Sequence, residues 1–142
     1  MPNMINDNYV RYRESKKSYY IKAKANNSVV LTVNNFYRHI KRKHPEMSIA
    51  IILDILVAPD MVYQASRNNK DKYYEKTLDD GIYRVVVSRG KPGERVVATA
   101  YRVECPKEFI YKHTYCIYDK NEDEDIPMQN QVKLFKEKFS TT

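Results

Sequence analysis

The segment with the fewest ways to fold is an apolar run in the first half of the chain. Ile49 to Val57 spells IAIILDILV, in which Asp54 is the only charged residue. Ser48 stands before the run and Pro59 follows it, which are typical start and stop signals of a helix. A helix that is apolar on nearly every side belongs in a protein core. The sequence therefore predicts a buried helix here, although a continuous apolar run can also form a buried strand.

A second helix is predicted just before it, over residues 34 to 44. Asn34 can cap its start. Pro45 disfavours a helical backbone at His44, so the helix ends there. Apolar residues recur at the spacing of one buried helix face, namely Val33, Phe36, Tyr37 and Ile40.

From Asp60 onward the apolar pattern changes from helical to extended. Asp80-Gly81 supplies the positive φ of a tight hairpin, and Lys91-Pro92-Gly93 marks another turn. Strands joined by such turns pair in antiparallel order, so we expect a four-stranded meander. Its strands are predicted over residues 61–65, 73–76, 82–88 and 95–103, with a short strand over 28–33 ahead of the first helix.

Side chains of the last strand in this meander alternate between two faces. Alternation puts Ala98 and Ala100 on one face, where the apolar helix can approach closely. Thr99 and Tyr101 then lie on the opposite face, and we expect Arg84 of the neighbouring strand beside them. A register shift of one residue would invert this assignment.

A chain of 142 residues can bury one hydrophobic core. The expected fold is α+β, with two N-terminal helices packed on a four-stranded antiparallel sheet. Residues 1–27 lack a clear period and are interpreted as a basic arm, or as an edge strand near 19–24. Residues 28–118 are expected to form the folded domain. Residues 119–142 combine an acidic loop at 122–125 with a short terminal helix.

Several functional classes lack their usual sequence signals. No stretch approaches the roughly 20 apolar residues that cross a bilayer, and residues 1–8 lack the apolar centre of a signal peptide. We therefore expect a cytoplasmic protein without membrane contact. Glycine-rich phosphate loops, nucleophile elbows and zinc-type clusters are missing from the sequence, so no cofactor or metal is expected. Cys105 and Cys116 are interpreted as reduced structural thiols.

Positive charge is concentrated near the start of the chain. The formal net charge is +7, yet residues 1–44 hold ten Lys and Arg against two acidic residues. Basic segments of this kind bind polyanions because Lys and Arg displace counterions from phosphates, so nucleic acid is the leading partner. The ribonuclease interpretation below makes RNA the expected nucleic acid. The alternative is a Lys-rich surface kept for solubility. The candidate nucleic-acid-binding residues are Arg11, Arg13, Lys16, Lys17, Arg38, Lys41, Arg42 and Lys43.

Candidate catalytic residues come from the basic helix and the sheet. RNA carries its own nucleophile, the 2′-hydroxyl, so a ribonuclease without metal needs a base, an acid and cations around the phosphate. His39 and His44 can each transfer a proton near neutral pH. Arg84, Lys41 or Arg42 can hold phosphate, while Thr99 or Tyr101 can donate hydrogen bonds. The alternative is structural, with one histidine capping a carbonyl and Tyr101 filling the sheet.

Several short motifs, taken in order, resemble a known group of proteins. The motifs are HIxxxHPE ending at Glu46, LxxPD at Leu56 to Asp60, and then YYEK, YRVVV and VVATAYRV. In this order they resemble the phage and mobile-element proteins grouped with the barnase, EndoU, colicin and RelE-like nucleases. The resemblance covers about half the chain, from Val29 to Val103. It implies helices before a four-stranded antiparallel sheet and a metal-independent ribonuclease. The positions it implies for the site are His39, His44, Thr99 and Tyr101, with Arg84 and Lys76 as weaker matches.

Three functions are compatible with these features. The first is a metal-independent endoribonuclease, such as a toxin with its own inhibitor protein. The second is a non-catalytic RNA- or DNA-binding accessory protein, in which the basic arm grips phosphate and tyrosines stack on unpaired bases. The third is an accessory protein of a mobile element that acts through protein contacts at the acidic run 122–125 or the terminal helix.

Overall fold

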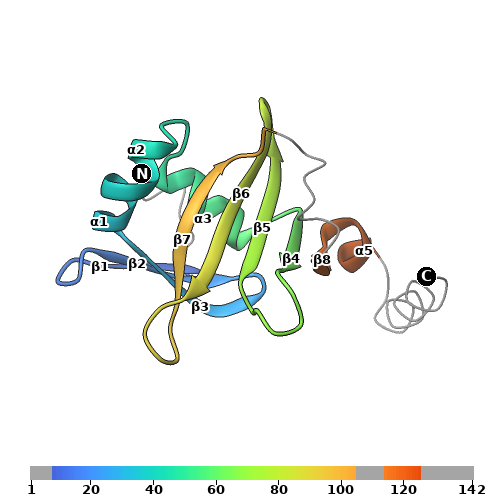
Figure 1. Cartoon of the computed structure of the whole chain (residues 1–142), viewed down its shortest axis with the longest axis horizontal. Coiled ribbons are helices and arrows are strands. Elements are labelled where there is room, and N and C mark those ends of the chain that lie inside the picture. Colours follow the sequence, from blue (N-terminus) through green and yellow to red (C-terminus); the bar gives the residue numbers. More distant parts are fainter. Residues whose placement is uncertain (1–7, 105–113, 126–142) are drawn as a thin grey trace.

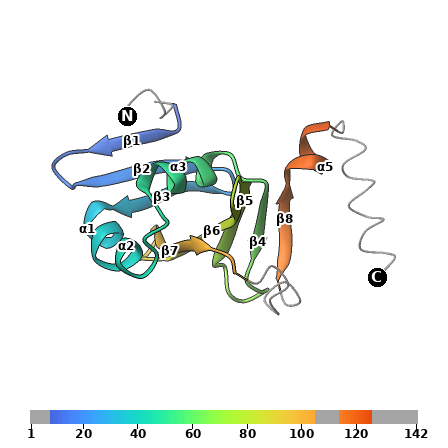
Figure 2. The same ribbon diagram turned by 90° about the horizontal axis from the view of Figure 1, so that it is seen from above.

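The computed structural model describes residues 8–104 and 114–125. Eight strands form one sheet in the order β1-β2-β3-β7-β6-β5-β4-β8, and the sheet is curled (Figures 1 and 2). The strands are β1 (Val10–Arg13), β2 (Ser18–Ala23), β3 (Asn26–Thr32), β4 (Met61–Gln64), β5 (Lys72–Leu78), β6 (Gly81–Arg89), β7 (Arg95–Arg102) and β8 (Tyr115–Asp119). The helices are α1 (Val33–Asn35), the π-helix η2 (Phe36–Ile40), α2 (Lys41–Lys43), α3 (Ile49–Val57) and α5 (Lys120–Asp125).

The sheet is mixed because one of its strand pairs is parallel. β3 and β7 run in the same direction and pair through Val30 and Val96 alone, whereas all other neighbours are antiparallel. In the view of Figure 1, β1–β3 run across the molecule and β5–β7 stand upright in front of α3. α3 therefore lies on one side of β5–β7, and the front of these strands is the side that faces away from α3.

The apolar helix predicted from the sequence is confirmed as α3. Ser48 is its N-cap, and the Ser48 hydroxyl accepts a hydrogen bond from the Ile51 backbone N–H at 3.1 Å. α3 packs against β2, β5 and β6. Its buried residues, Ile52, Leu53, Ile55 and Leu56, form the centre of the core. The core therefore lies inside the curl of the sheet, around this one helix.

The other predicted helix differs from expectation in its cap and in its buried face. Thr32, not Asn34, is the N-cap, and its hydroxyl accepts from the Asn35 backbone N–H at 2.9 Å. The middle of this segment is a π-helix, whose wider turn keeps Phe36 and Ile40 buried but leaves Tyr37 57% exposed. The helix ends at the residue before Pro45, as predicted, since α2 stops at Lys43 and the next residue leaves helical geometry.

The predicted architecture of two N-terminal helices on a four-stranded antiparallel sheet is wrong. The sheet has eight strands, and the helices are short. Residues 1–27 were interpreted as an arm or an edge strand, but β2 lies between β1 and β3 in the sheet interior. The apolar alternation of β2 rests on Ile21 and Ala23, which face the core, while Tyr19 and Tyr20 obscure the pattern because tyrosine suits either face.

Within this larger sheet, the four strands β4–β7 pair in consecutive antiparallel order as a meander. Gly81 has a φ of 141° and Gly93 a φ of 81°, so both turns use the positive φ that glycine permits. The pairing of β6 with β7 shifts by one residue at a bulge near Ala98. Because of the bulge, Val97 and Ala100 both face the core, and the expected shared face of Ala98 and Ala100 is wrong.

The C-terminal part of the chain is described only in residues 114–125. The acidic run 122–125 was expected to be a loop, but it belongs to the helix α5. β8 pairs with β4 at the edge of the sheet. Cys105 and the predicted terminal helix lie outside the described residues. Cys116 is exposed, and its thiol donates to the Tyr118 carbonyl at 3.4 Å. No helix in the described ranges is long and apolar enough to cross a membrane.

Candidate functional site

The face of β5–β7 that points away from α3 carries most of the predicted site residues. Cross-strand pairing places Glu75 opposite Arg84, and Arg84 opposite Tyr101. Thr99 lies two residues before Tyr101 and therefore shares its face. Tyr73, Val86, Thr99 and Tyr101 on this face are each partly exposed. We call it the open face of β5–β7.

Arg84 lies beneath this face and is fully buried. Its Nε donates to the Glu75 carboxylate at 2.7 Å, and its Nη1 donates to the Tyr101 hydroxyl oxygen at 2.9 Å. The guanidinium also lies 5.8 Å from the ring centre of Tyr73 and 5.5 Å from that of Tyr101. Burial alone would lower the pKa of Arg84, but the hydrogen bond with Tyr101 and the Glu75 carboxylate outweigh it and raise the pKa. Arg84 is therefore a fixed cation that orients Tyr101.

His44 meets the same cluster from the connection between α2 and α3. Its ring centre lies 5.4 Å from that of Tyr101, with 37° between the ring planes. The imidazole Nδ1 lies 3.9 Å from the Glu46 carboxylate, and the His44 side chain is 31% exposed. Neither ring nitrogen has a hydrogen-bond partner in the described ranges. His44 is thus accessible to a ligand and is positioned by ring contact.

The connection that carries His44 is held by three side-chain contacts. The Lys41 ammonium donates to the backbone carbonyls of Pro45 at 2.7 Å and Met47 at 2.8 Å. The Glu46 carboxylate accepts from the Arg102 backbone N–H at 3.0 Å. Burial alone would raise the pKa of Glu46, but this hydrogen bond and the charges of its neighbours lower it. The Lys41 ammonium, predicted to bind nucleic acid, is engaged within the fold.

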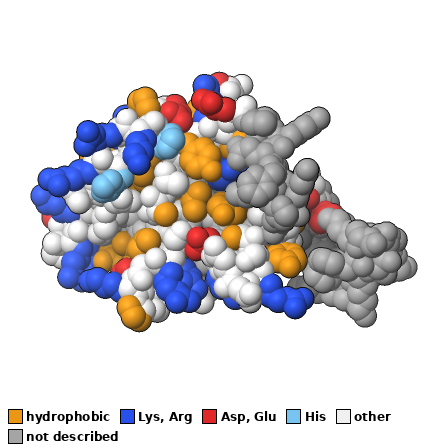
Figure 3. All heavy atoms as spheres, in the orientation of Figure 1, with side chains coloured by type: hydrophobic (Ala, Val, Ile, Leu, Met, Phe, Trp, Pro, Cys, Tyr) orange, Lys and Arg blue, Asp and Glu red, His pale blue; other side chains and the backbone are white. Residues whose placement is uncertain are grey.

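His39 does not join this cluster. It is exposed on the helical segment and lines a surface hollow with four other residues, Asn34, Arg38, Arg42 and Lys43. The structure therefore brings His44, Thr99, Tyr101 and Arg84 together and leaves His39 among cations. Figure 3 shows Lys and Arg side chains around the helical part of the front face, next to apolar side chains over the sheet, with His side chains between them.

The predicted cations of the N-terminal residues occupy a different part of the surface. Arg11 and Arg13 point outward from β1 and line a pocket on β1–β3. Lys16 and Lys17 lie in the β1–β2 turn, where Lys17 adopts a positive φ of 45°. These four residues are exposed.

Three residues of the site were missed from the sequence. Glu75 and Tyr73 flank Arg84, and Glu46 lies beside His44. A two-residue turn at Asp80-Gly81 would place Thr77 opposite Arg84. In the structure Leu78 lies opposite Gly81, so the turn residues are Asp79 and Asp80, and Glu75 lies opposite Arg84. Glu46 ends the HPE motif next to His44, but its hydrogen-bond partner, the Arg102 backbone N–H, lies on β7 and has no local signal in the sequence.

Comparisons with protein-family models, with curated proteins and with solved structures found no match to this chain. The described residues include no group of three or more His, Cys, Asp or Glu side chains arranged to hold a metal ion.

Proposed function

We propose that the protein is a metal-independent endoribonuclease whose catalytic centre is formed by His44 and Tyr101. The observation that carries the proposal is the contact of a partly exposed imidazole with a tyrosine whose hydroxyl oxygen is held by a buried arginine. A proton acceptor and a proton donor thus lie side by side on an accessible face. These are the two groups that RNA cleavage by its own 2′-hydroxyl requires.

In this reaction the 2′-oxygen bonds to the adjacent phosphorus, and the bond from phosphorus to the 5′-oxygen of the next nucleotide breaks. The products are a 2′,3′-cyclic phosphate and a 5′-hydroxyl. His44 accepts the proton of the 2′-hydroxyl, and the nearby Glu46 carboxylate stabilises the imidazolium that forms. The step requires no oxidant, metal or covalent intermediate with the protein.

Tyr101 supplies the second proton to the departing 5′-oxygen. Because Arg84 donates to the Tyr101 oxygen, the phenolic hydrogen points away from Arg84 and toward other acceptors. The same guanidinium stabilises the phenolate left behind. Proton exchange with water then returns the His44 proton to solvent and reprotonates Tyr101, which restores both groups for the next turnover.

Arg84 acts through Tyr101 and does not bind phosphate directly, because its side chain is 0% exposed. Exposed cations for the substrate are available nearby in the chain. Arg42 and Lys43 end α2 immediately before His44, and both are exposed. Their charges attract RNA to the edge of the open face.

The test is cleavage of end-labelled RNA in the presence of EDTA, with the ends of the products identified. His44→Ala is expected to reduce the rate by about 10²–10⁴-fold, the usual contribution of a general base. His39→Ala is the matched control, since it removes the other histidine of the same segment and should leave the rate within about twofold. Tyr101→Phe, which keeps the ring but removes the donor, should also reduce the rate.

Equal cleavage by the His44→Ala and His39→Ala variants would refute the proposal, as would cleavage of DNA of the same sequence, which lacks the 2′-hydroxyl. RNA binding without any cleavage would favour the second function, a non-catalytic nucleic-acid binder. The specific observation behind that candidate is the set of exposed cations on β1 and the helical segment.

A further inference from the structure

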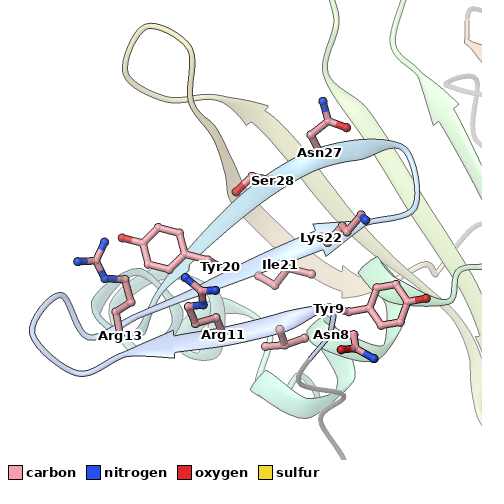
Figure 4. Close-up of a pocket in the computed structure, with 10 residues that line it drawn as sticks. Asn8, Tyr9, Arg11, Arg13, Tyr20, Ile21, Lys22, Asn27 and Ser28 are labelled. Atoms are coloured by element: carbon pink, nitrogen blue, oxygen red, sulfur yellow. The ribbon is translucent and has the colours of Figure 1, made fainter.

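The outer face of β1 and β2 combines cations with aromatic rings around a hollow. The hollow has a volume of about 350 Å³ (Figure 4). Its lining includes three cations, Arg11, Arg13 and Lys22, and two tyrosines, Tyr9 and Tyr20. The remaining lining residues are Asn8, Val10, Ile21, Asn27 and Ser28, so no carboxylate contributes to it. This face lies apart from His44 and Tyr101, which do not line it.

The arrangement follows from the alternation of the two strands. Val10 and Ile21 pair across the strands and are buried, so the residues on either side of them point outward. Arg11 lies directly opposite Tyr20. The Lys22 backbone N–H donates to the Tyr9 carbonyl at 2.7 Å, which places these two residues side by side. Each of the two tyrosines therefore has a cation across the strand pair and another beside it on the outward face of its own strand.

The cations on this face have no acidic partners in the described ranges. Arg11, Arg13 and Lys22 form none of the ion pairs found there. Arg13 instead lies over the ring of Tyr20, 5.8 Å from its centre. Cations without counterions leave a positive surface whose electrostatic complement is a polyanion.

The exposed rings distinguish between kinds of polyanion. Tyr9 is 42% exposed, and Tyr20 is partly exposed beside two arginines. Bases in a duplex are stacked on one another and cannot stack on a protein side chain, whereas bases of a single strand can. A surface kept positive only for solubility would need no tyrosines between its cations.

We propose that the outer face of β1 and β2 is a docking surface for single-stranded RNA, with bases stacked on Tyr9 and Tyr20 and phosphates bound by Arg11, Arg13 and Lys22. This proposal deepens the ribonuclease function by naming the form of RNA that is bound and where it docks. Single-strand binding by alternating cations and aromatic rings predicts weak base preference and strong dependence on salt.

The experiment measures binding of a fluorescent single-stranded RNA of mixed sequence to the whole chain, as a function of salt concentration. An RNA hairpin of the same length is the duplex comparison. Arg11→Gln should weaken single-strand binding and lower the slope of log affinity against log salt by about 0.7, the value for one phosphate contact on a single strand. Arg67→Gln is the matched control, because Arg67 is an exposed arginine of the β4–β5 loop outside this face.

Tyr20→Ala is expected to reduce affinity about tenfold through loss of base stacking. Tyr20→Leu keeps apolar area on the sheet, so it separates loss of the ring from loss of folding. Both variants should bind single strands more weakly and hairpins without change. The proposal is overturned if Arg11→Gln and Arg67→Gln have equal effects, or if Tyr20→Leu binds as tightly as the unmodified chain.

A single-stranded DNA of the same sequence separates this surface from the catalytic proposal. It lacks the 2′-hydroxyl, so it is not cleaved, yet it offers the same phosphates and base faces for docking. DNA binding that depends on Arg11 and Tyr20 supports the surface even where His44→Ala leaves RNA cleavage unchanged. Loss of cleavage in His44→Ala with binding unaffected by Tyr20→Leu supports the catalytic site and rejects this surface.

Discussion

The buried pair of Glu75 and Arg84 gives the sharpest test of how the open face is built. The Glu75 side chain is 8% exposed and that of Arg84 is 0%, with 2.7 Å between carboxylate oxygen and Nε. Their charge centres are then about 4 Å apart, where an effective dielectric constant near 20 gives an attraction of about 4 kcal/mol. Glu75→Gln keeps the shape of the side chain but removes its charge. The variant removes the negative charge that contacts the buried Arg84 guanidinium.

We expect Glu75→Gln to lower the free energy of unfolding by about 3–5 kcal/mol, the usual cost of breaking a buried ion pair on one side. Asp54→Asn is the matched control, because it removes the carboxylate of the Lys76–Asp54 ion pair, which has a contact of 2.9 Å with side chains 23% and 53% exposed. Exposed pairs contribute at most about 1 kcal/mol. Urea denaturation followed by circular dichroism measures both variants, and equal losses would refute the argument from burial.

The double variant Glu75→Leu with Arg84→Met keeps the result interpretable where the single variant does not fold. Replacing both members of a buried pair by apolar residues is often neutral or stabilising, so this variant should recover most of the lost stability. It also removes the donor to the Tyr101 hydroxyl. A folded double variant that cleaves RNA at the unmodified rate would show that Arg84 does not position Tyr101 for catalysis.

Substitutions elsewhere test the packing that supports the site. Tyr74→Phe removes a buried hydroxyl that accepts from the Ala25 backbone N–H at 3.0 Å and donates to Asn26 at 2.6 Å. The free energy of unfolding, measured by urea denaturation, should therefore fall by about 1–3 kcal/mol. Unchanged stability would contradict this. Ser48→Ala removes the cap of α3 and should cost about 1 kcal/mol, whereas Ser48→Asn keeps an acceptor and should cost much less; thermal melting compares the two. Glu46→Gln should reduce the loss of folding stability at acid pH. Because the folded state lowers the pKa of Glu46, its stabilisation is present above the ordinary pKa and is lost as the pH falls through the folded value. Urea denaturation at neutral and acid pH measures the free energy of unfolding of the variant and of the unmodified protein. An equal decrease at acid pH in the two proteins would argue against a contribution from the Glu46 carboxylate.

Local signals were sufficient for the parts of the fold that depend on neighbouring residues. α3 follows from an apolar run between Ser48 and Pro59, and the β5–β6 hairpin follows from Asp80-Gly81. Arg84 lies opposite Tyr101 through the pairing of β6 with β7, which are joined by the predicted turn at Lys91-Pro92-Gly93. In each case the deciding interaction lies within a few residues or across one tight turn.

The wrong predictions concern features of the fold that depend on contacts between distant parts of the chain. The β1–β2 pairing joins two segments rich in Tyr and cations, whose burial depends on packing of α3 against β2. The π-helical turn that exposes Tyr37 likewise has no signature in apolar spacing. The separation of His39 from His44 follows from where the helical segment docks, and five residues of sequence cannot reveal that position.

The position of His44 follows from the limited pairing between β3 and β7. β3 pairs with β7 through one residue pair only, so beyond Val96 the backbone of β7 has β6 as its only strand neighbour in the described part of the chain. Side chains supply further partners: Asn35 donates to the Val97 carbonyl at 2.9 Å, and Glu46 accepts from the Arg102 backbone N–H. Buried or partly buried backbone groups need such partners.

These two side-chain hydrogen bonds, from Asn35 and to Glu46, attach the start of the helical segment and the connection after it to β7. His44 lies between Asn35 and Glu46 in the chain, and Tyr101 lies between Val97 and Arg102 on the strand. The contact between the His44 and Tyr101 rings therefore results from the hydrogen bonds that Asn35 and Glu46 form with the backbone of β7. Loss of the Glu46 hydrogen bond should displace His44 from Tyr101 before it unfolds the domain, which links the stability of this attachment to the geometry of the proposed catalytic centre.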